Sequence, residues 1–322
     1  MSYLINKEIL SLRQNIITAV RTFFIEGGYL EISTPELAPS FIPESTIKLF
    51  ETRFVSASGS VDPLFLLPSP ELWHKLLLSE GVGNTFEVCK CFRNSDAHGE
   101  HHNAEFTMLE WYTTGAGYIE SIEILEKLFD TLAPFCRAEF RTPFDRVSVD
   151  QLFRSVIGTG LADLADRTEL ERVCRLEDVS VSTEESWEEL YHKLFLTRIE
   201  PAIPKDRPMI LRDYPARINC LAKRIEGTEL CERWELYAGG MEIANCFTEA
   251  VDQTEVLRYV EEEKRHLPEH LQEHISENFV KAFSGEYPVC SGVALGFDRL
   301  LMYLAGVDSI DEVLLFPFSS FF

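Results

Sequence analysis

The sequence has no stretch of about 18 consecutive apolar residues, the length that a membrane-spanning helix requires. Its amino terminus, MSYLINKEILSLRQNII, also lacks the basic start, the apolar run and the small-residue cleavage site of a signal peptide. These absences argue against a membrane-embedded or secreted protein. We therefore expect a cytoplasmic protein with no membrane segment.

Basic residues are scarce. The 322 residues include 30 Lys and Arg against 53 Asp and Glu, which makes the formal net charge −23. A protein that binds along a nucleic-acid backbone needs clustered Lys and Arg, and no run of Lys and Arg here is longer than two residues, as at Lys223-Arg224. Extended binding of tRNA is therefore not expected, although a local basic patch is compatible with an acidic total.

The two common nucleotide-binding sequences are missing as well. No G-x-x-x-x-G-K-[ST] occurs, and no G-x-G-x-x-G follows an expected strand. The eight cysteines are scattered, and Cys89 and Cys91 have no second pair or suitably spaced histidine that would complete a zinc site. If ATP binds, a different arrangement of residues must hold it.

The hydropathy pattern predicts an α+β protein. Apolar residues spaced close to 3.6 predict helices at 7–25, 119–132, 254–266 and 276–283. Alternating residues predict strands at 29–37, 84–93, 104–112, 208–219 and 231–250. This order favours an antiparallel sheet flanked by helices over repeating βαβ units. Because no linker is visible, we expect 1–322 to form one domain, with acidic helices inserted between about 140 and 205.

The strands at 84–93 and 104–112 carry a first group of candidate site residues. Arg93 ends one strand, and an arginine on a rigid sheet offers a planar fork that suits phosphate. Phe106, Met108 and Glu110 share a face of the returning strand because of its two-residue period. The pattern predicts a phosphate site with a ring and a carboxylate beside it. An ordinary hairpin with a surface arginine and a core phenylalanine is the alternative.

A second group lies in RWELYAGGMEIANCFTE, where Glu235, Glu242 and Glu249 recur every seven residues. If Gly239-Gly240 forms a hairpin turn, Glu235 and Glu242 face each other across two strands. Facing carboxylates repel unless a cation lies between them, and Mg²⁺ takes one or two carboxylates together with nucleotide phosphates. The pair is a candidate Mg²⁺ site, and a solvated acidic hairpin is the alternative.

A third group is the segment 292–299, GVALGFDR. Glycines in a strand let the backbone approach a ligand closely, and Arg299 would open the following helix and reach into the same site. A junction whose glycines only permit tight packing is the alternative. We expect Arg93, Phe106, Glu242 and Arg299 to converge on one cavity.

Together these segments resemble the class II aminoacyl-tRNA synthetases. FRNSDAHGEHHNAEFTMLEWY resembles motif 2, most closely in the lysine branch, and GVALGFDRLLMYLAGVDSIDEVLLFPF resembles motif 3. GGYLEISTPEL resembles motif 1, which forms the dimer interface, and SPELWHKLL at 69–77 resembles the segment that binds the substrate amino group. The resemblance runs from about residue 10 to the carboxyl terminus. It implies the class II fold, the use of ATP and Mg²⁺, and a homodimer formed through residues 10–40.

The resemblance also implies a role for individual residues. Arg93 and Arg299 would be the catalytic groups, Arg93 on the α-phosphate and Arg299 on the γ-phosphate and one adenine face, while Phe106 stacks on the other face. The remaining nucleotide contacts would be Asn94, Ser95, Asn103, Glu242, Ile243 and Gly296, and the Mg²⁺ ligands would be Glu235 and Glu242. The substrate contacts would be Ser69, Pro70, Glu71, Glu110, Tyr112, Glu249 and Ala294.

Two positions depart from the family's pattern. Ser95 stands two residues after Arg93, where the family usually has Glu, and Asp96 in a loop one residue longer is the candidate to replace it. Ala104 replaces a usual proline.

Motif 1 begins almost at once, so we expect no anticodon-binding domain, which would need roughly a hundred residues. The sequence therefore resembles the stand-alone paralogues that attach a lysine-like group to translation elongation factor P. Ala294 agrees, because the tRNA enzymes usually have Gly in the same G-V-A-L-G string. The resemblance implies ATP-dependent activation of (R)-β-lysine or lysine as an acyl-adenylate and its transfer to a lysine of elongation factor P. A truncated lysine- or asparagine-type synthetase paralogue acting on tRNA or a small molecule, and a non-catalytic regulator on the same fold, are the alternatives.

Overall fold

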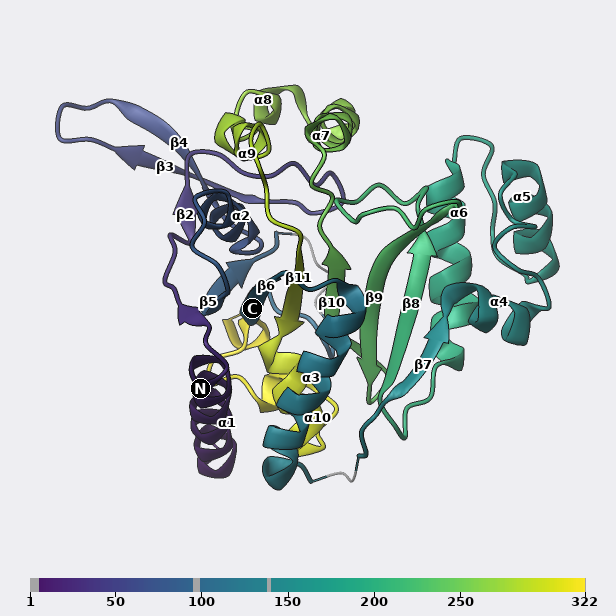
Figure 1. The fold of residues 1–322 in the computed structure, drawn as a ribbon, viewed down its shortest axis with the longest axis horizontal. Coiled ribbons are helices and arrows are strands. Elements are labelled where there is room, and N and C mark those ends of the chain that lie inside the picture. Colours follow the sequence, from purple (N-terminus) through teal and green to yellow (C-terminus); the bar gives the residue numbers. More distant parts are fainter. Residues whose placement is uncertain (1–5, 95–98, 138–139, 322) are drawn as a thin grey trace.

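The computed structural model describes residues 6–94, 99–137 and 140–321. Its centre is an eight-stranded sheet in the order β1-β5-β6-β11-β10-β9-β8-β7 (Figure 1). In that order the strands are Leu30–Glu31, Thr85–Phe92, Glu105–Thr114, Cys290–Gly296, Met241–Thr248, Leu230–Ala238, Met209–Pro215 and Asp145–Ser148. The six central strands are antiparallel, as predicted, whereas β1–β5 and β7–β8 pair in parallel at the two edges.

Three helices cover one face of the sheet and form the main core with it: α1 (Lys7–Glu26), α3 (Tyr118–Leu132) and α10 (Phe297–Ala305) (Figure 1). In α1 the buried residues Ile9, Ile16, Val20 and Phe24 follow a helical period, which is the pattern that predicted the helix. The Asn6 side chain caps the first turn by accepting hydrogen bonds from two backbone N–H groups. The predicted helices at 7–25 and 119–132 are confirmed.

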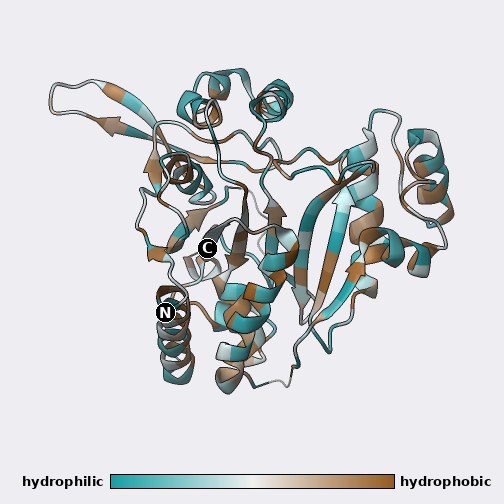
Figure 2. Ribbon diagram, viewed as in Figure 1, coloured by the Kyte–Doolittle hydropathy of each residue, from teal (hydrophilic) through white to brown (hydrophobic). Residues whose placement is uncertain are grey.

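The opposite face of the sheet is partly covered by α2 (Glu71–Ser79), α7 (Gln253–His266) and α9 (Glu277–Ala282), with α8 (Glu269–Gln272) between the last two. Strand β8 begins with hydrophobic residues and ends with hydrophilic ones, and α7 is mostly hydrophilic (Figure 2). Short helical turns at Ala133–Phe135, Ile310–Glu312 and Phe318–Phe321 complete this part of the chain. In the described ranges, no helix is both long enough and apolar enough to cross a membrane.

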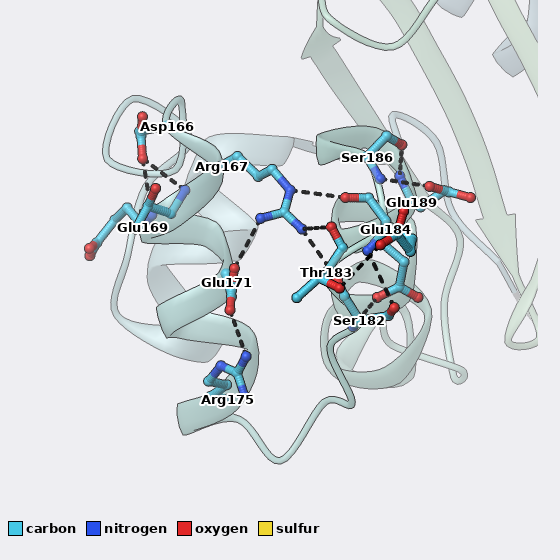
Figure 3. Close-up of polar contacts among 12 residues, drawn as sticks. Asp166, Arg167, Glu169, Glu171, Arg175, Ser182, Thr183, Glu184, Ser186 and Glu189 are labelled. Carbon is cyan, nitrogen blue, oxygen red and sulfur yellow. Dashed lines mark hydrogen bonds and ion pairs between the residues drawn. The ribbon is translucent and has the colours of Figure 1, made fainter.

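The insertion between 140 and 205 contains the expected helices. Helices α4 (Val149–Ile157), α5 (Arg167–Leu176) and α6 (Trp187–Leu194), followed by turns at Phe195–Ile199 and Glu200–Ala202, pack beyond the β7 edge around a second hydrophobic cluster. From α5, the Arg167 guanidinium donates to Glu185 O at 2.9 Å, Glu171 Oε2 at 3.0 Å and Ser182 O at 3.2 Å (Figure 3). These bonds tie α5 to the segment before α6. Strand β7 was not predicted, because its four residues are too short for a visible alternation.

The predicted strand at 29–37 is wrong in extent. Only Leu30–Glu31 and Leu37–Ala38 (β2) are strands, because Glu87 accepts hydrogen bonds from Thr34 N and Thr34 Oγ1, and Pro35 has no N–H to donate. Strand β2 joins a hairpin of β3 (Phe50–Val55) and β4 (Val61–Leu66) that projects from the main body (Figure 1). This hairpin and α2 had no counterpart among the predicted elements.

One buried carboxylate connects the three segments that resemble synthetase motifs. Asp298, at the start of α10, accepts hydrogen bonds from Arg13 Nη1 on α1 and from Thr107 N on β6, both at 2.6 Å. Arg13 Nη2 also donates to Thr107 Oγ1 at 2.6 Å, and its guanidinium lies 5.0 Å from the centre of the Phe297 ring. The first helix, the central hairpin and the last helix are therefore held in register by a single charged group.

Candidate active site

The strand register places many of the predicted residues on the face opposite the main core. One row of cross-strand neighbours runs over five strands and consists of Glu87, Glu110, Ala294, Asn245 and Glu235. Cross-strand neighbours project to the same side of a sheet. Two of the predicted carboxylates and the predicted specificity residue therefore share one row.

The adjacent row on the same face consists of Thr85, Tyr112, Gly292, Phe247 and Arg233. A Cβ atom at Gly292 would lie 2.6 Å from Tyr112 Cε1 and 3.1 Å from Glu249 Oε1, so no larger residue fits without displacing one of them. The first glycine of G-V-A-L-G thus makes room for two of the predicted substrate contacts. The prediction that this segment serves a site gains support from that geometry.

Three acidic residues and one lysine gather at this end of the face. We call Glu71, Lys75, Glu110, Tyr112 and Glu249 the amine cluster. Lys75 Nζ lies 2.6 Å from Glu71 Oε1 and 2.9 Å from Glu249 Oε2, and the second contact is an ion pair whose angles do not make a hydrogen bond. Among the described residues, the buried atoms Glu110 Oε2 and Glu249 Oε1 have no hydrogen-bond partner, an arrangement that favours a ligand with donors.

Burial dominates the electrostatics of the amine cluster. It raises the pKa of Glu249 to about 8, against the opposing effect of the Lys75 ammonium, and Glu71 raises it further. Burial, with Glu71 next in size, also raises the pKa of Glu110 well above its ordinary value. For Lys75 burial acts against the charged form, but Glu249 and Glu71 outweigh it and the pKa rises. Without a cationic ligand, burial therefore favours the neutral forms of Glu110 and Glu249.

Arg93 lies by Phe106 and Arg299 by Glu242, and the charges of both arginines act on Glu242; their convergence on one cavity stays a prediction. The Arg93 guanidinium lies 5.3 Å from the centre of the Phe106 ring, and Arg299 Nη1 donates to Glu242 O at 2.9 Å. Arg299 also contacts His101 O at 3.1 Å and His102 Nε2 at 2.8 Å. Burial and the nearby Glu235 raise the pKa of Glu242 to about 7, while Arg299 lowers it.

The predicted opposition of Glu235 and Glu242 is wrong. A bulge between Glu242 and Ala244 shifts the pairing, so that Glu242 lies opposite Tyr237 and Glu235 opposite Asn245. Glu235 accepts hydrogen bonds from Tyr214 Oη at 2.5 Å, Tyr237 Oη at 2.8 Å and Arg233 Nη2 at 2.6 Å. The two glutamates still share a face, but diagonally, and both oxygens of Glu235 already have protein donors.

The other predicted residues divide into four groups. Ser69 and Pro70 lead directly into α2, and the Pro70 carbonyl accepts from Trp73 N and His74 N. The side-chain amides of Asn94 and Asn103 bind other parts of the protein. Asn94 donates to Leu49 O, and Asn103 donates to Glu105 O and accepts from Phe318 N. Ile243 is buried at the bulge, and a Cβ at Gly296 would lie 3.7 Å from Ile243 O, so packing alone does not require that glycine. Ser95 and Asp96 lie outside the described residues.

Three charged residues of the site were not predicted. Lys75 lies inside the amine cluster, Arg233 lies in the row with Tyr112, and Glu44 is an exposed residue whose charge interacts with Arg93 and Glu71. For Lys75 a signal existed, since its spacing of four residues from Glu71 places both on one face of a helix. Nothing in the sequence relates Glu44 to Arg93.

The class II synthetases require a sheet of this strand order. They also require arginines, here Arg93 and Arg299, and a carboxylate cluster on the face of the sheet opposite the main core. The family model for class II tRNA synthetases of the D, K and N type matches residues 5–320, and the chain belongs to this family.

Three of the similar curated proteins carry the same name. The elongation factor P (R)-β-lysine ligase of Klebsiella pneumoniae (strain 342) is 36% identical over 313 residues, which cover 94% of this chain and 93% of the relative. The ligase of the same name from Yersinia enterocolitica serotype O:8 is 34% identical over 315 residues, covering 95% and 93%. That from Salmonella paratyphi A (strain ATCC 9150 / SARB42) is 35% identical over 313 residues, covering 94% and 93%.

Proposed function

We propose that the protein uses ATP to activate (R)-β-lysine, or lysine, and transfers the acyl group to a lysine side chain of translation elongation factor P. The amine cluster carries this proposal. Its buried carboxylates lie beside Arg93 and Arg299, so a substrate with two ammonium groups and a carboxylate can bind its amines at one end and present its carboxylate to a nucleotide at the other. The relatives named as ligases of (R)-β-lysine support the choice of substrate and acceptor.

In the first step the substrate carboxylate oxygen attacks the α-phosphorus of ATP. The bond from that phosphorus to the bridging oxygen breaks, and pyrophosphate leaves with the electron pair. Negative charge grows on the phosphate oxygens, and positively charged groups held in place before the reaction stabilise it without reorganisation. Arg93 on the sheet edge and Arg299 at the start of α10 are the groups we assign to this task.

In the second step the amine of the acceptor lysine attacks the acyl carbon of the adenylate. A new amide bond forms, the bond to the phosphate oxygen breaks, AMP leaves, and the proton lost by the amine passes to solvent. The acceptor is a translation factor, and on that ground we propose a cytoplasmic location.

Glu242 is the residue best suited to bind Mg²⁺. No group of three or more His, Cys, Asp or Glu side chains in the described part of the chain is arranged to hold a metal alone. Mg²⁺, however, commonly binds one or two carboxylates together with substrate phosphates. We assign Glu242 as the direct ligand, and Glu235, whose oxygens are engaged, as the charge behind it. The ion would offset charge on the phosphates and help pyrophosphate to leave.

We also propose a homodimer. A groove of about 500 Å³ lies against the motif 1 segment, lined by Ile32, Ser33, Thr34, Pro35, Trp73, Leu76, Leu77 and Glu80. Ile25, Leu30 and Leu37 near it are 55%, 55% and 42% exposed. Exposed apolar groups in one patch indicate an interaction surface. Light scattering at micromolar concentration should show a dimer, and Leu30→Glu should shift it towards monomer.

The test of the function is a pair of assays. Exchange of labelled pyrophosphate into ATP should depend on an added amino acid, with (R)-β-lysine above L-lysine and both above asparagine. Transfer of labelled (R)-β-lysine should then require elongation factor P and should not occur to bulk tRNA. Charging of tRNA would support the truncated synthetase instead, and no exchange with any amino acid would support a non-catalytic regulator.

A further inference from the structure

The side chain of Lys75 carries an ammonium group that is fully buried in the protein. The side chain has 0% exposure, lies between Glu71 and Glu249, and has its Nζ 5.3 Å and 5.8 Å from the ring centres of Phe247 and Phe279. Its carbonyl oxygen also accepts a hydrogen bond from Tyr287 Oη at 3.3 Å. Helix α2, strand β10, helix α9 and the segments at Glu249 and Tyr287 thus define its position.

A buried group of like charges is unstable unless cations or protons offset it. Glu110 and Glu249 are buried and the Glu71 side chain is 23% exposed, and among the described residues Lys75 is the ammonium in direct contact with Glu71 and Glu249. When all four groups are ionised, two negative charges stay uncompensated. A substrate with two ammonium groups supplies the two positive charges that balance them.

Lys75 also determines which carboxylate oxygens face a ligand. It occupies Glu71 Oε1 and Glu249 Oε2, and this orients the carboxylate planes. Glu249 Oε1 and Glu110 Oε2 are buried oxygens with neither a hydrogen-bond donor nor a contact with Lys75 in the described structure. These two oxygens are therefore open to donors from a ligand.

We infer that Lys75 is a positioning residue that acts as an internal counter-ion: it sets the charge of the amine cluster to match a diamino acid and orients Glu71 and Glu249 towards the two substrate ammonium groups. This inference rests on the proposed function, because it takes the substrate to be a diamino acid. Without the ammonium, the buried Glu110 and Glu249 lie beside Glu71 without that counter-ion. These two carboxyls then take up protons more readily, and the substrate must displace those protons when it binds.

The test is Lys75→Met, with Lys281→Met as the matched control. Lys281 forms the same (i, i+4) pair, with Glu277 Oε2 at 2.8 Å, but on the exposed side of α9, where its side chain is 67% exposed. Lys75→Met should raise the KM for (R)-β-lysine about 10- to 100-fold at pH 7, the usual cost of losing a hydrogen bond to a charged group, with little change in the KM for ATP. Lys281→Met should leave both unchanged.

The pH dependence distinguishes an electrostatic role from damage to the fold. In Lys75→Met the KM should recover as the pH rises towards 9, because the extra carboxyl protons are lost, whereas a packing defect would be independent of pH. If Lys75→Met matches Lys281→Met, or if its defect does not change with pH, the inference is overturned.

A second measurement uses the unmodified protein. Calorimetric titration with (R)-β-lysine at pH 7, in two buffers with different ionisation enthalpies, should show net release of protons as the carboxyls ionise around the substrate. Binding without proton release would overturn the inference even if Lys75→Met fails to fold. Absence of any binding or exchange in the unmodified protein would instead count against the proposed function.

Discussion

Two neighbouring rows of the sheet, one residue apart on the same five strands, have opposite chemistry. Phe86, Trp111, Val293, Cys246 and Trp234 form one row, and each is at most 1% exposed against the helices of the main core. The next row is Glu87, Glu110, Ala294, Asn245 and Glu235. The two-residue period of a strand lets one segment build a core and a site at once. Substitutions in the first row should therefore change stability, and those in the second row should change activity.

The largest expected effect is a loss of activity caused by a substitution on the face of the sheet opposite the main core. Gly292→Ala inserts a methyl group at a position 2.6 Å from Tyr112 and 3.1 Å from Glu249, so one of these residues must move. Displacement of a positioning group by about 1 Å can cost about 100-fold in rate. We expect a loss of that size in exchange of pyrophosphate with (R)-β-lysine. A variant with normal exchange would show that the contact is not used.

Ala294→Gly and Val293→Ala are adjacent and face opposite sides. Ala294→Gly should move preference from (R)-β-lysine towards L-lysine by about 10- to 100-fold, since one methyl group in a site is worth ~1–3 kcal/mol. Val293→Ala should lower the free energy of unfolding by about 1–3 kcal/mol and leave the preference unchanged. The ratio of kcat/KM for the two lysines, with chemical denaturation, checks both. The comparison fails if Val293→Ala shifts the preference as much.

A smaller effect should appear in the pH dependence of stability. A carboxyl whose pKa is raised by folding holds a proton that the unfolded chain has lost, so stability falls as the pH rises towards the folded pKa. For Glu249, whose pKa is raised by burial from 4.5 to about 8, the loss should run from about pH 4.5 to about 8 and level off above that. Buried His74, whose pKa is lowered by burial from 6.5 to about 3, acts in the opposite direction between those two values, so the effect of Glu249 should be clearest above about pH 6.5.

The measurement is the melting temperature of the protein without ligands from pH 6.5 to 8.5 at constant ionic strength. Glu249→Gln, which cannot ionise, should give a flatter dependence than the unmodified protein. Equal slopes would mean that Glu249 is already ionised in the folded state.

The smallest effect is expected away from both rows. Arg167→Ala removes the bonds that tie α5 to the segment before α6 (Figure 3), but the group is exposed and its ion pairs are screened. We expect a fall in melting temperature of at most about 2 °C and normal activation of (R)-β-lysine. A large loss of activation would show that the insertion contributes to the site.

The sequence was sufficient for the parts of the molecule that local patterns determine. The helices at both ends and the hairpin of β9 and β10 with its Gly239-Gly240 turn were predicted and are confirmed. What was missed depends on distant partners. The bulge after Glu242 changes a register that strict alternation cannot reveal, and β7 is a strand only because β8 lies beside it. From the sequence alone, Lys75 is expected to be a surface lysine, because its contacts with Glu249 and Phe247 exist only in the folded protein.

The bonds of Arg299 have a consequence for the entropy of binding. A long side chain usually loses conformational freedom when a ligand immobilises it, and this loss weakens binding. Here the guanidinium is already held by the carbonyl oxygens of His101 and Glu242, and the backbone beneath it is anchored through Asp298 and Arg13. Most of the conformational entropy of the Arg299 side chain is therefore lost already during folding. A phosphate that binds there contacts a preorganised cation.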